Sequence, residues 1–264
     1  MTTLENNPVL YASTQHGYAF RNVIELLTVN LRFGVFNCTA EGMELSMVTS
    51  NNEILFKVMF DQFDEYRITT EKRLLFSVNL LHLFKLLKTI QKKDAVQIRL
   101  SETDSSMLYF TIFRKGGHND HQRSHIRIHI NPVENITIPV PEGYQYQIQL
   151  SSFDFRRTIK DLECVTNHFI ELDACRDRLQ FRSIDQGLYE RTEELAQKKI
   201  TDCDTTIVFR AKYSIQYFKR VLKLCGLNET VRLSYTMHLP LRLDVDIPQL
   251  GHIAVCLRAV EEST

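Results

Sequence analysis

The sequence predicts an α+β protein built from two similar domains, each about half of the chain. Three segments recur in the same order at a separation of 134 to 135 residues. Both halves also mix helical apolar spacing with strand-like alternation. The recurring segments pair Ala19–Leu27 with Asp154–Leu162, Leu83–Lys88 with Tyr217–Lys223, and Val96–Leu100 with Val231–Tyr235. A period this long indicates a duplicated domain rather than a short-repeat solenoid.

Four segments have the spacing of amphipathic helices. The second begins after Asn79, a residue type that caps helix N-termini, and its apolar face includes Ile90. The other three helices are expected at roughly Tyr18–Val29, Ser152–Cys164 and Ser214–Leu224. In each of the four, Lys or Arg side chains are expected to lie off the apolar face. In the second, Lys85, Lys88 and Lys92 are expected to form a stripe opposite that face.

The remaining periodic segments predict β-strands. The halves are joined by residues 131–146, where Pro132, Pro139, Pro141 and Gly143 predict an extended connector, because proline cannot donate to a sheet ladder. The expected domains are therefore 1–130 and 147–264. The predicted strands are Arg32–Cys38, Gly42–Met47, Ile54–Phe60, Leu74–Val78, Val96–Leu100, Met107–Phe113, Ser124–Ile130, Phe169–Leu172, Leu179–Ser183, Ile207–Arg210, Val231–Tyr235, Leu241–Ile247 and Ile253–Ala259.

Charge is segregated although the chain as a whole is neutral. The 264 residues contain 32 basic and 32 acidic side chains. Segments 18–29, 79–93, 152–164 and 212–223 hold 12 Lys and Arg against 4 Asp and Glu, so they carry +8 and the rest carries −8. One interpretation is a surface for the phosphate backbone of a nucleic acid, without base recognition. The other is that Lys and Arg are good helix formers on solvated faces.

The cysteines and histidines do not form a recognisable metal or catalytic motif. The six cysteines include no Cys-x-x-Cys pair, and the first residues lack a secretion signal, so we expect free thiols in the nucleus or cytoplasm. His118, Asp120 and His121 open a histidine-rich stretch, 118–129. We interpret these three residues as part of a polar loop, Arg114–His121, rather than as a metal site. We expect no cofactor and no enzymatic activity, because no phosphate loop, nucleophile elbow or paired carboxylates occur.

Several motifs resemble the proliferating cell nuclear antigen family, the eukaryotic sliding clamps. The resemblance runs over nearly the whole chain. It rests on Gly17–Val29, Glu41–Leu45, Phe63–Arg67, Val78–Leu80 leading into Phe84–Lys88, Ile138-Pro139, and Leu239–Leu241 followed by Leu250–Ile253. Identity is low, so the chain resembles a divergent member, with a viral source as one of the alternatives.

This resemblance implies a ring, usually a homotrimer, whose helices line a hole for duplex DNA. Such a clamp tethers DNA polymerase and other replication proteins that carry short peptide motifs. It would act in the nucleus, or at a cytoplasmic replication site if the protein is viral. By motif position, the resemblance assigns DNA contact to Arg21, Lys85, Lys88, Arg157, Lys160 and Lys219; helix geometry adds Arg220 and Lys223.

The resemblance also implies a partner-peptide pocket beneath the connector. Glu53 stands where the family usually has an apolar residue, and Arg258–Glu261 replaces the family's usual C-terminal run. The alternative for the pocket residues is ordinary core or linker packing. The residues carried over are Val48, Leu55, Ile136, Ile138, Pro139, Pro240 and Leu257.

A subunit seam follows from the same resemblance, between Ser124–Ile130 and about Leu188–Ala196 of a neighbour. Opposite charge would help to hold it, and the histidines would make it sensitive to pH. The alternative is two solvated edge strands protected by charge. The residues concerned are His125, Arg127 and His129 on one strand and Glu190, Glu193 and Glu194 on the other.

Two other assemblies remain open beside the homotrimeric ring. One is a monomeric or dimeric factor of the same fold that grips DNA by charge. The other is one subunit of a heterotrimeric checkpoint clamp.

Overall fold

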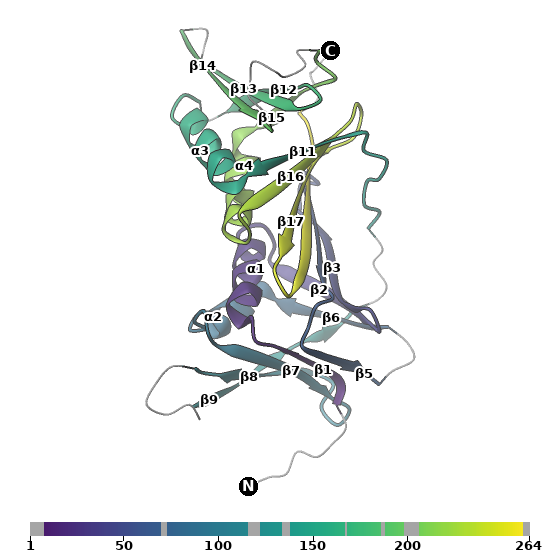
Figure 1. Ribbon diagram of the computed structural model, residues 1–264. Helices are drawn as coiled ribbons and strands as arrows, with labels where there is room; N and C mark the ends of the chain where they lie inside the picture. Colours follow the sequence, from purple (N-terminus) through teal and green to yellow (C-terminus); the bar gives the residue numbers. More distant parts are fainter. Residues whose placement is uncertain are drawn as a thin grey trace. The chain divides into compact units, whose positions relative to one another are not determined.

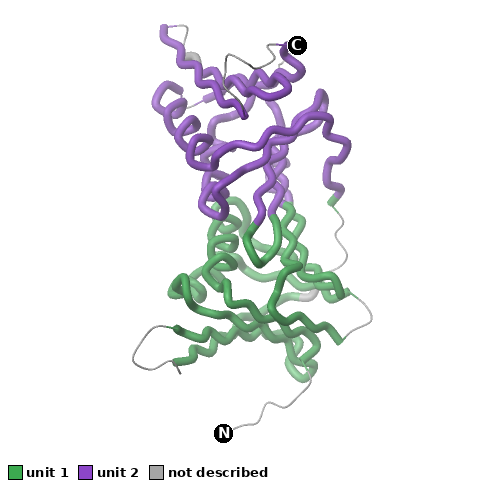
Figure 2. The backbone as a smooth tube through the Cα atoms, in the orientation of Figure 1, with its two compact units in different colours: residues 1–47, 57–138, 247–252 green, residues 48–56, 139–246, 253–264 purple. Residues whose placement is uncertain are grey.

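The computed structural model describes residues 8–69, 73–115, 122–133, 138–166, 168–185, 188–197 and 206–260. The chain divides into two compact units, coloured separately in Figure 2. Unit 1 comprises residues 1–47, 57–138 and 247–252, and unit 2 comprises residues 48–56, 139–246 and 253–264. Both units combine antiparallel sheets with two helices, as the repeat predicts.

Unit 1 contains a five-stranded antiparallel sheet in the order β5-β1-β7-β8-β9 (Figure 1). A second run of neighbouring strands follows the order β10-β6-β2-β3. The strands are β1 Pro8–Thr14, β2 Phe33–Thr39, β3 Gly42–Val48, β5 Glu65–Ile68, β6 Leu74–Asn79, β7 Ala95–Ser101, β8 Met107–Phe113, β9 Arg123–His129 and β10 Asn131–Pro132. Strand β4, Ile54–Phe60, belongs to unit 2 up to Phe56 and to unit 1 from Lys57.

Helices α1 (Gly17–Asn30) and α2 (Leu80–Leu87) bury their apolar faces in unit 1. The ring of Phe20 lies 5.2 Å from that of Phe60 and 6.5 Å from that of Phe110, which joins the helix to both groups of strands. The N-cap of α2 is Asn79, whose side-chain oxygen accepts a hydrogen bond from the His82 amide at 3.0 Å. The predicted cap is confirmed.

Helix α2 is shorter than its apolar spacing predicts. It ends at Leu87, and Ile90 is buried from the turn that follows rather than from the helix. The buried carboxylate of Asp94 accepts a hydrogen bond from the Gln91 amide at 2.9 Å and stabilises this turn. Lys92 therefore lies beyond the helix, and the predicted stripe with Lys85 and Lys88 is wrong at that position.

Unit 2 repeats the arrangement with a four-stranded sheet, β14-β13-β12-β15, and a second run of neighbours, β17-β16-β11. Its helices are α3 Ser152–Glu163 and α4 Ile215–Val221, the latter continued by a 3-10 turn over Leu222–Gly226. The strands are β11 Tyr146–Ser151, β12 Phe169–Ala174, β13 Arg178–Asp185, β14 Tyr189–Ala196, β15 Phe209–Ser214, β16 Thr230–Tyr235 and β17 Leu241–Ile247. Strand β18, Gly251–Leu257, belongs to unit 1 up to His252 and to unit 2 from Ile253.

The core of unit 2 is centred on three phenylalanines. The rings of Phe155, Phe181 and Phe218 lie 6.2 Å apart in every pair, and all three side chains are fully buried. Phe155 comes from α3, Phe218 from α4 and Phe181 from β13, so both helices are packed against the sheet. Such aromatic contacts contribute roughly 0.5–1.5 kcal/mol per pair beyond burial.

The sequence patterns missed β1, β5, β10 and β11, and Asn131 and Pro132 of the predicted connector form the two-residue strand β10 beside β6. Strand β1 carries a short alternation of Leu10, Ala12 and Thr14 behind a proline, and β5 has only four residues, none of them buried. Strand β11 begins at Tyr146, the last residue assigned to the connector. In the described part of the chain, no helix is long and apolar enough to cross a membrane.

Candidate nucleic-acid interface and partner-binding residues

The three candidate DNA-contact residues of unit 1 divide into one restrained side chain and two exposed ones. Arg21 on α1 is ion-paired with Glu25 at 3.3 Å and its side chain is only 17% exposed. Its guanidinium lies over the rings of Tyr18 and Phe84, 5.2 and 5.8 Å from their centroids. Lys85 and Lys88, at the end of α2, are exposed and form no ion pair among the described residues. They are the better candidates for phosphate contact.

The basic residues of unit 2 are partly neutralised by neighbouring carboxylates. Lys219 lies 2.6 Å from Glu163, and Arg157 lies 3.8 Å from Asp161. Lys160 is exposed and takes part in no ion pair within the described ranges. Lys223, in the 3-10 turn, is also exposed.

Arg220 has a neighbour that its position on a basic helix did not predict. Its guanidinium lies 3.6 Å from the carboxylate of Glu53. The Tyr217 hydroxyl, one turn earlier on α4, also bonds to Glu53; burial first, and then this bond, raises the pKa of Tyr217. The main chain of Glu53 accepts a hydrogen bond from the Arg258 amide at 3.0 Å. Glu53 and Arg258, which both belong to the departures from the family pattern, therefore lie together with Arg220 in unit 2.

The residues carried over to the partner pocket differ in accessibility. Val48 and Pro240 are half-buried in unit 2, whereas Leu55 and Leu257 of the same unit are buried. Ile138 is half-buried and Pro139 exposed; Ile136 lies outside the described residues. Leu257 in particular has no exposed surface and serves as core in this structure.

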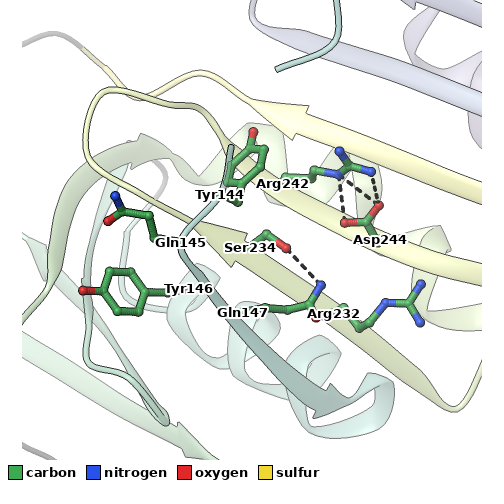
Figure 3. Close-up of a pocket in the computed structure, with 8 residues that line it drawn as sticks. All are labelled: Tyr144, Gln145, Tyr146, Gln147, Arg232, Ser234, Arg242 and Asp244. Atoms are coloured by element: carbon green, nitrogen blue, oxygen red, sulfur yellow. Dashed lines mark hydrogen bonds and ion pairs between the residues drawn. The ribbon is translucent and has the colours of Figure 1, made fainter. Parts of the chain in front are cut away.

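A polar cavity of about 410 Å³, which sequence reasoning missed, lies over strands β11, β16 and β17 of unit 2 (Figure 3). The Tyr144 hydroxyl donates to the carbonyl of Pro240 at 2.9 Å, which ties the end of the connector to a pocket candidate. Arg242 is held by a forked pair with Asp244 at 2.8–3.0 Å. The lining residues are Tyr144, Gln145, Tyr146, Gln147, Arg232, Ser234, Arg242 and Asp244. The sequence signal that could have revealed this cavity is Tyr144, which follows the Ile138-Pro139 motif by five residues.

Both strands proposed for the seam are sheet edges, since β9 and β14 each end the strand order of their sheet. On β9, the side chains of His125, Arg127 and His129 are exposed on one face while Ile128 is buried on the other. A strand partner could therefore pair with either edge through backbone groups alone.

The acidic residues of β14 do not share one face. Glu190 and Glu194 lie on one side of the strand and Glu193 on the other, because side chains alternate. Each has a basic neighbour in its own sheet: Glu190 pairs with Arg182 at 3.7 Å, Glu193 with Arg191 at 2.7 Å, and Glu194 with Arg178 at 3.6 Å. Charge across a seam would have to compete with these pairs.

Burial raises the pKa of three thiols in the described part of the chain. It raises the pKa of Cys38 to about 12, although the hydrogen bond from Tyr66 opposes the shift. Burial likewise raises the pKa of Cys256 and of Cys225 to about 11. No cluster of potential metal ligands occurs among the described residues; His118, Asp120 and His121 lie outside them.

Comparison with known proteins gives these two units a family. The family model for the N-terminal domain of proliferating cell nuclear antigen matches residues 9–131, and the family model for the C-terminal domain matches residues 138–260. The chain belongs to the proliferating cell nuclear antigen family. The resemblance inferred from the sequence and the two-domain α+β clamp fold are confirmed.

Relatives of the clamp come from archaea, a virus and a eukaryote. DNA polymerase sliding clamp 1 of Sulfolobus acidocaldarius is 24% identical over 245 residues, covering 90% of this chain and 94% of that protein. A probable DNA polymerase sliding clamp 1 of Paramecium bursaria Chlorella virus 1 is 21% identical over 261 residues, covering 94% and 95%. The crystal structure of the Entamoeba histolytica antigen has a TM-score of 0.82 at 17% identity, covering 97% of this chain and all of that one.

Proposed function

We propose that this chain is a DNA polymerase sliding clamp that closes into a ring, with three copies as the favoured number. Duplex DNA would pass through a hole lined by α1, α2, α3 and α4. The observation that carries the DNA-facing part is the placement of Lys85, Lys88 and Lys160. All three are exposed on or beside helices of a clamp fold, without an ion pair among the described residues.

Weak contacts suffice for this function, because a closed ring is retained on DNA by topology. The helical segments carry +8 within a chain of zero net charge, which favours sliding electrostatic contact over tight gripping. Several of these charges are offset by pairs such as Lys219–Glu163, which reduces the field further. No base-reading contact is required.

Partner proteins would dock by short peptides near Val48, Pro139 and Pro240, the accessible members of the predicted pocket that lie in unit 2. The tyrosine contact to the Pro240 carbonyl keeps the connector end close to this site within unit 2. Buried Leu55 and Leu257 would support the pocket from below rather than touch the peptide. The site of action would be the nucleus, or a cytoplasmic replication site for a viral protein.

Light scattering at several protein concentrations and two salt levels tests the assembly. A species near three times the chain mass of 30.9 kDa is expected. A monomer at every concentration would contradict the self-closing ring. Steep salt dependence of that monomer's binding to linear duplex would indicate a charge-gripping factor, and weak binding would indicate a subunit that lacks its partners.

A further inference from the structure

A row of alternating arginine and tyrosine side chains crosses all five strands of the unit 1 sheet. Tyr11 on β1 is paired with Arg67 of β5 on one side and with Arg99 of β7 on the other. Arg99 is opposite Tyr109 of β8, and Tyr109 is opposite Arg127 of β9. The complete row, from one sheet edge to the other, is Arg67, Tyr11, Arg99, Tyr109 and Arg127.

The row lies on the solvent face of this sheet. The residues next to Tyr11 and Arg99 along their strands, such as Ala12 and Ile98, are buried on the opposite face. All three arginines are exposed, and the side chain of Arg67 is 75% exposed. The two tyrosines are half-buried between them.

Tyr11 separates two of the arginines and contacts both, and the rings of both tyrosines are held by hydrogen bonds. The guanidinium groups of Arg67 and Arg99 lie 5.9 and 5.7 Å from the ring centroid of Tyr11. The Tyr11 hydroxyl accepts a hydrogen bond from Gln97 at 2.6 Å, and the Tyr109 hydroxyl donates to Asp104 at 2.6 Å. Because both rings are fixed, less side-chain entropy is lost when a ligand engages the arginines.

The spacing of the charges defines a ligand. Neighbouring strands lie about 4.8 Å apart, so arginines on every second strand are about 10 Å apart. A peptide in the extended polyproline II conformation rises about 3.1 Å per residue with three residues per turn, so carboxylates three residues apart lie on one face at about the same spacing. Arginine guanidinium groups bind carboxylates through paired hydrogen bonds.

We propose that this arginine–tyrosine row is a docking surface for an extended acidic segment of a partner protein, with acidic residues at every third position. Arginine and tyrosine are the residue types that dominate protein–protein hot spots. Carboxylates also sit among the cations: Glu65 lies 3.7 Å from Arg67, and Asp104 is bonded to Tyr109. This interrupted field suits separated carboxylates better than the dense charge of nucleic acid.

Binding of a fluorescent peptide to the full chain, followed by anisotropy at 50 and 150 mM salt, tests this surface. The probe carries three glutamates spaced Glu-x-x-Glu-x-x-Glu among Ser and Ala, and a second peptide has the same composition with contiguous glutamates. The spaced peptide is expected to bind at least threefold more tightly. Arg99→Gln is expected to weaken it about tenfold, and Arg99→Lys by less, because charge is kept but the paired geometry is lost.

Arg176→Gln is the matched control, since Arg176 is an exposed arginine of the unit 2 sheet hairpin. It should leave peptide binding unchanged, and light scattering should show the same mass for all variants, which separates this surface from ring assembly. Equal affinity of Arg99→Gln and the parent chain would overturn the proposal. The proposal would also be overturned if a 15-nucleotide oligo-dT bound more tightly than the spaced peptide and Arg99→Gln abolished that binding. The face would then serve single-stranded nucleic acid.

Discussion

The carboxylate of Glu53 lies 3.6 Å from the guanidinium of Arg220. This pair joins a residue whose family counterpart is usually apolar with one that helix geometry assigns to DNA contact. Part of the positive charge of α4 is therefore offset within unit 2. The basic residues of the four helices should contribute unequally to DNA binding.

Lys88→Ala and Lys160→Ala are expected to weaken binding to a short linear duplex more than Arg220→Ala or Arg21→Ala. The two lysines are exposed, whereas Arg220 and Arg21 already have carboxylate neighbours. Each lysine variant should reduce the slope of log K against log salt by about one unit. Fluorescence anisotropy across a salt series measures both quantities. If Arg220→Ala or Arg21→Ala weakened binding more than the lysine variants, Lys88 and Lys160 would not belong to the DNA-facing surface.

Ring assembly is expected to strengthen as pH falls from 8 to 5.5. In the proposed ring, His125 and His129 on β9 would face the acidic strand β14 of a neighbour. Histidine is the side-chain type whose charge ordinarily changes in this pH range. The double variant His125→Gln/His129→Gln should lose this dependence while the parent retains it. Sedimentation velocity at several pH values measures the assembly. A dissociation constant that is the same in both proteins at every pH would rule out a histidine contribution to the seam.

Gly251→Ala should destabilise unit 1 by several kcal/mol. Gly251 has a φ of +146°, and an added Cβ would lie 1.9 Å from the carbonyl oxygen of Met59. Gly226→Ala is the control, because a Cβ there meets nothing within 4 Å. Urea unfolding followed by circular dichroism gives both free energies. Similar midpoints for the two variants would show that the chain at Gly251 can move aside.

Iodoacetamide at pH 8 should modify Cys164 much faster than Cys38 or Cys256 in the folded chain. Cys164 is exposed, while burial raises the pKa of Cys38 to about 12 and that of Cys256 to about 11. The buried thiols are therefore protonated at pH 8 and poor nucleophiles. Mass spectrometry of tryptic peptides follows each site, and all three should react in urea. Rapid labelling of Cys38 without denaturant would show that unit 1 opens readily.

Sequence periodicity was a good guide where one face of an element is buried. The helix that contains Phe155 and the strand Met107–Phe113 follow their patterns to within a residue. It failed at the end of α2, because Ile90 keeps the apolar spacing while Asp94 stabilises a turn instead. It also failed for β5, which is too short and too exposed to show a period.

The candidate site was predictable by residue type but not by the state of each residue. The basic character of the helices follows from composition, yet the pairs Arg21–Glu25 and Lys219–Glu163 distinguish restrained cations from exposed ones. The three glutamates of β14 were grouped by proximity in sequence, although strand alternation separates Glu193 from the other two.

The sequence by itself determined the duplicated α+β architecture, the family and the concentration of positive charge in four helices, because these depend on periodicity and residue type. Tertiary structure alone decided which charges are neutralised. It also aligned Arg67, Tyr11, Arg99, Tyr109 and Arg127 in one row across a sheet. The physical reason is that strand register and long-range ion pairs join residues distant in sequence, and no local pattern records those contacts.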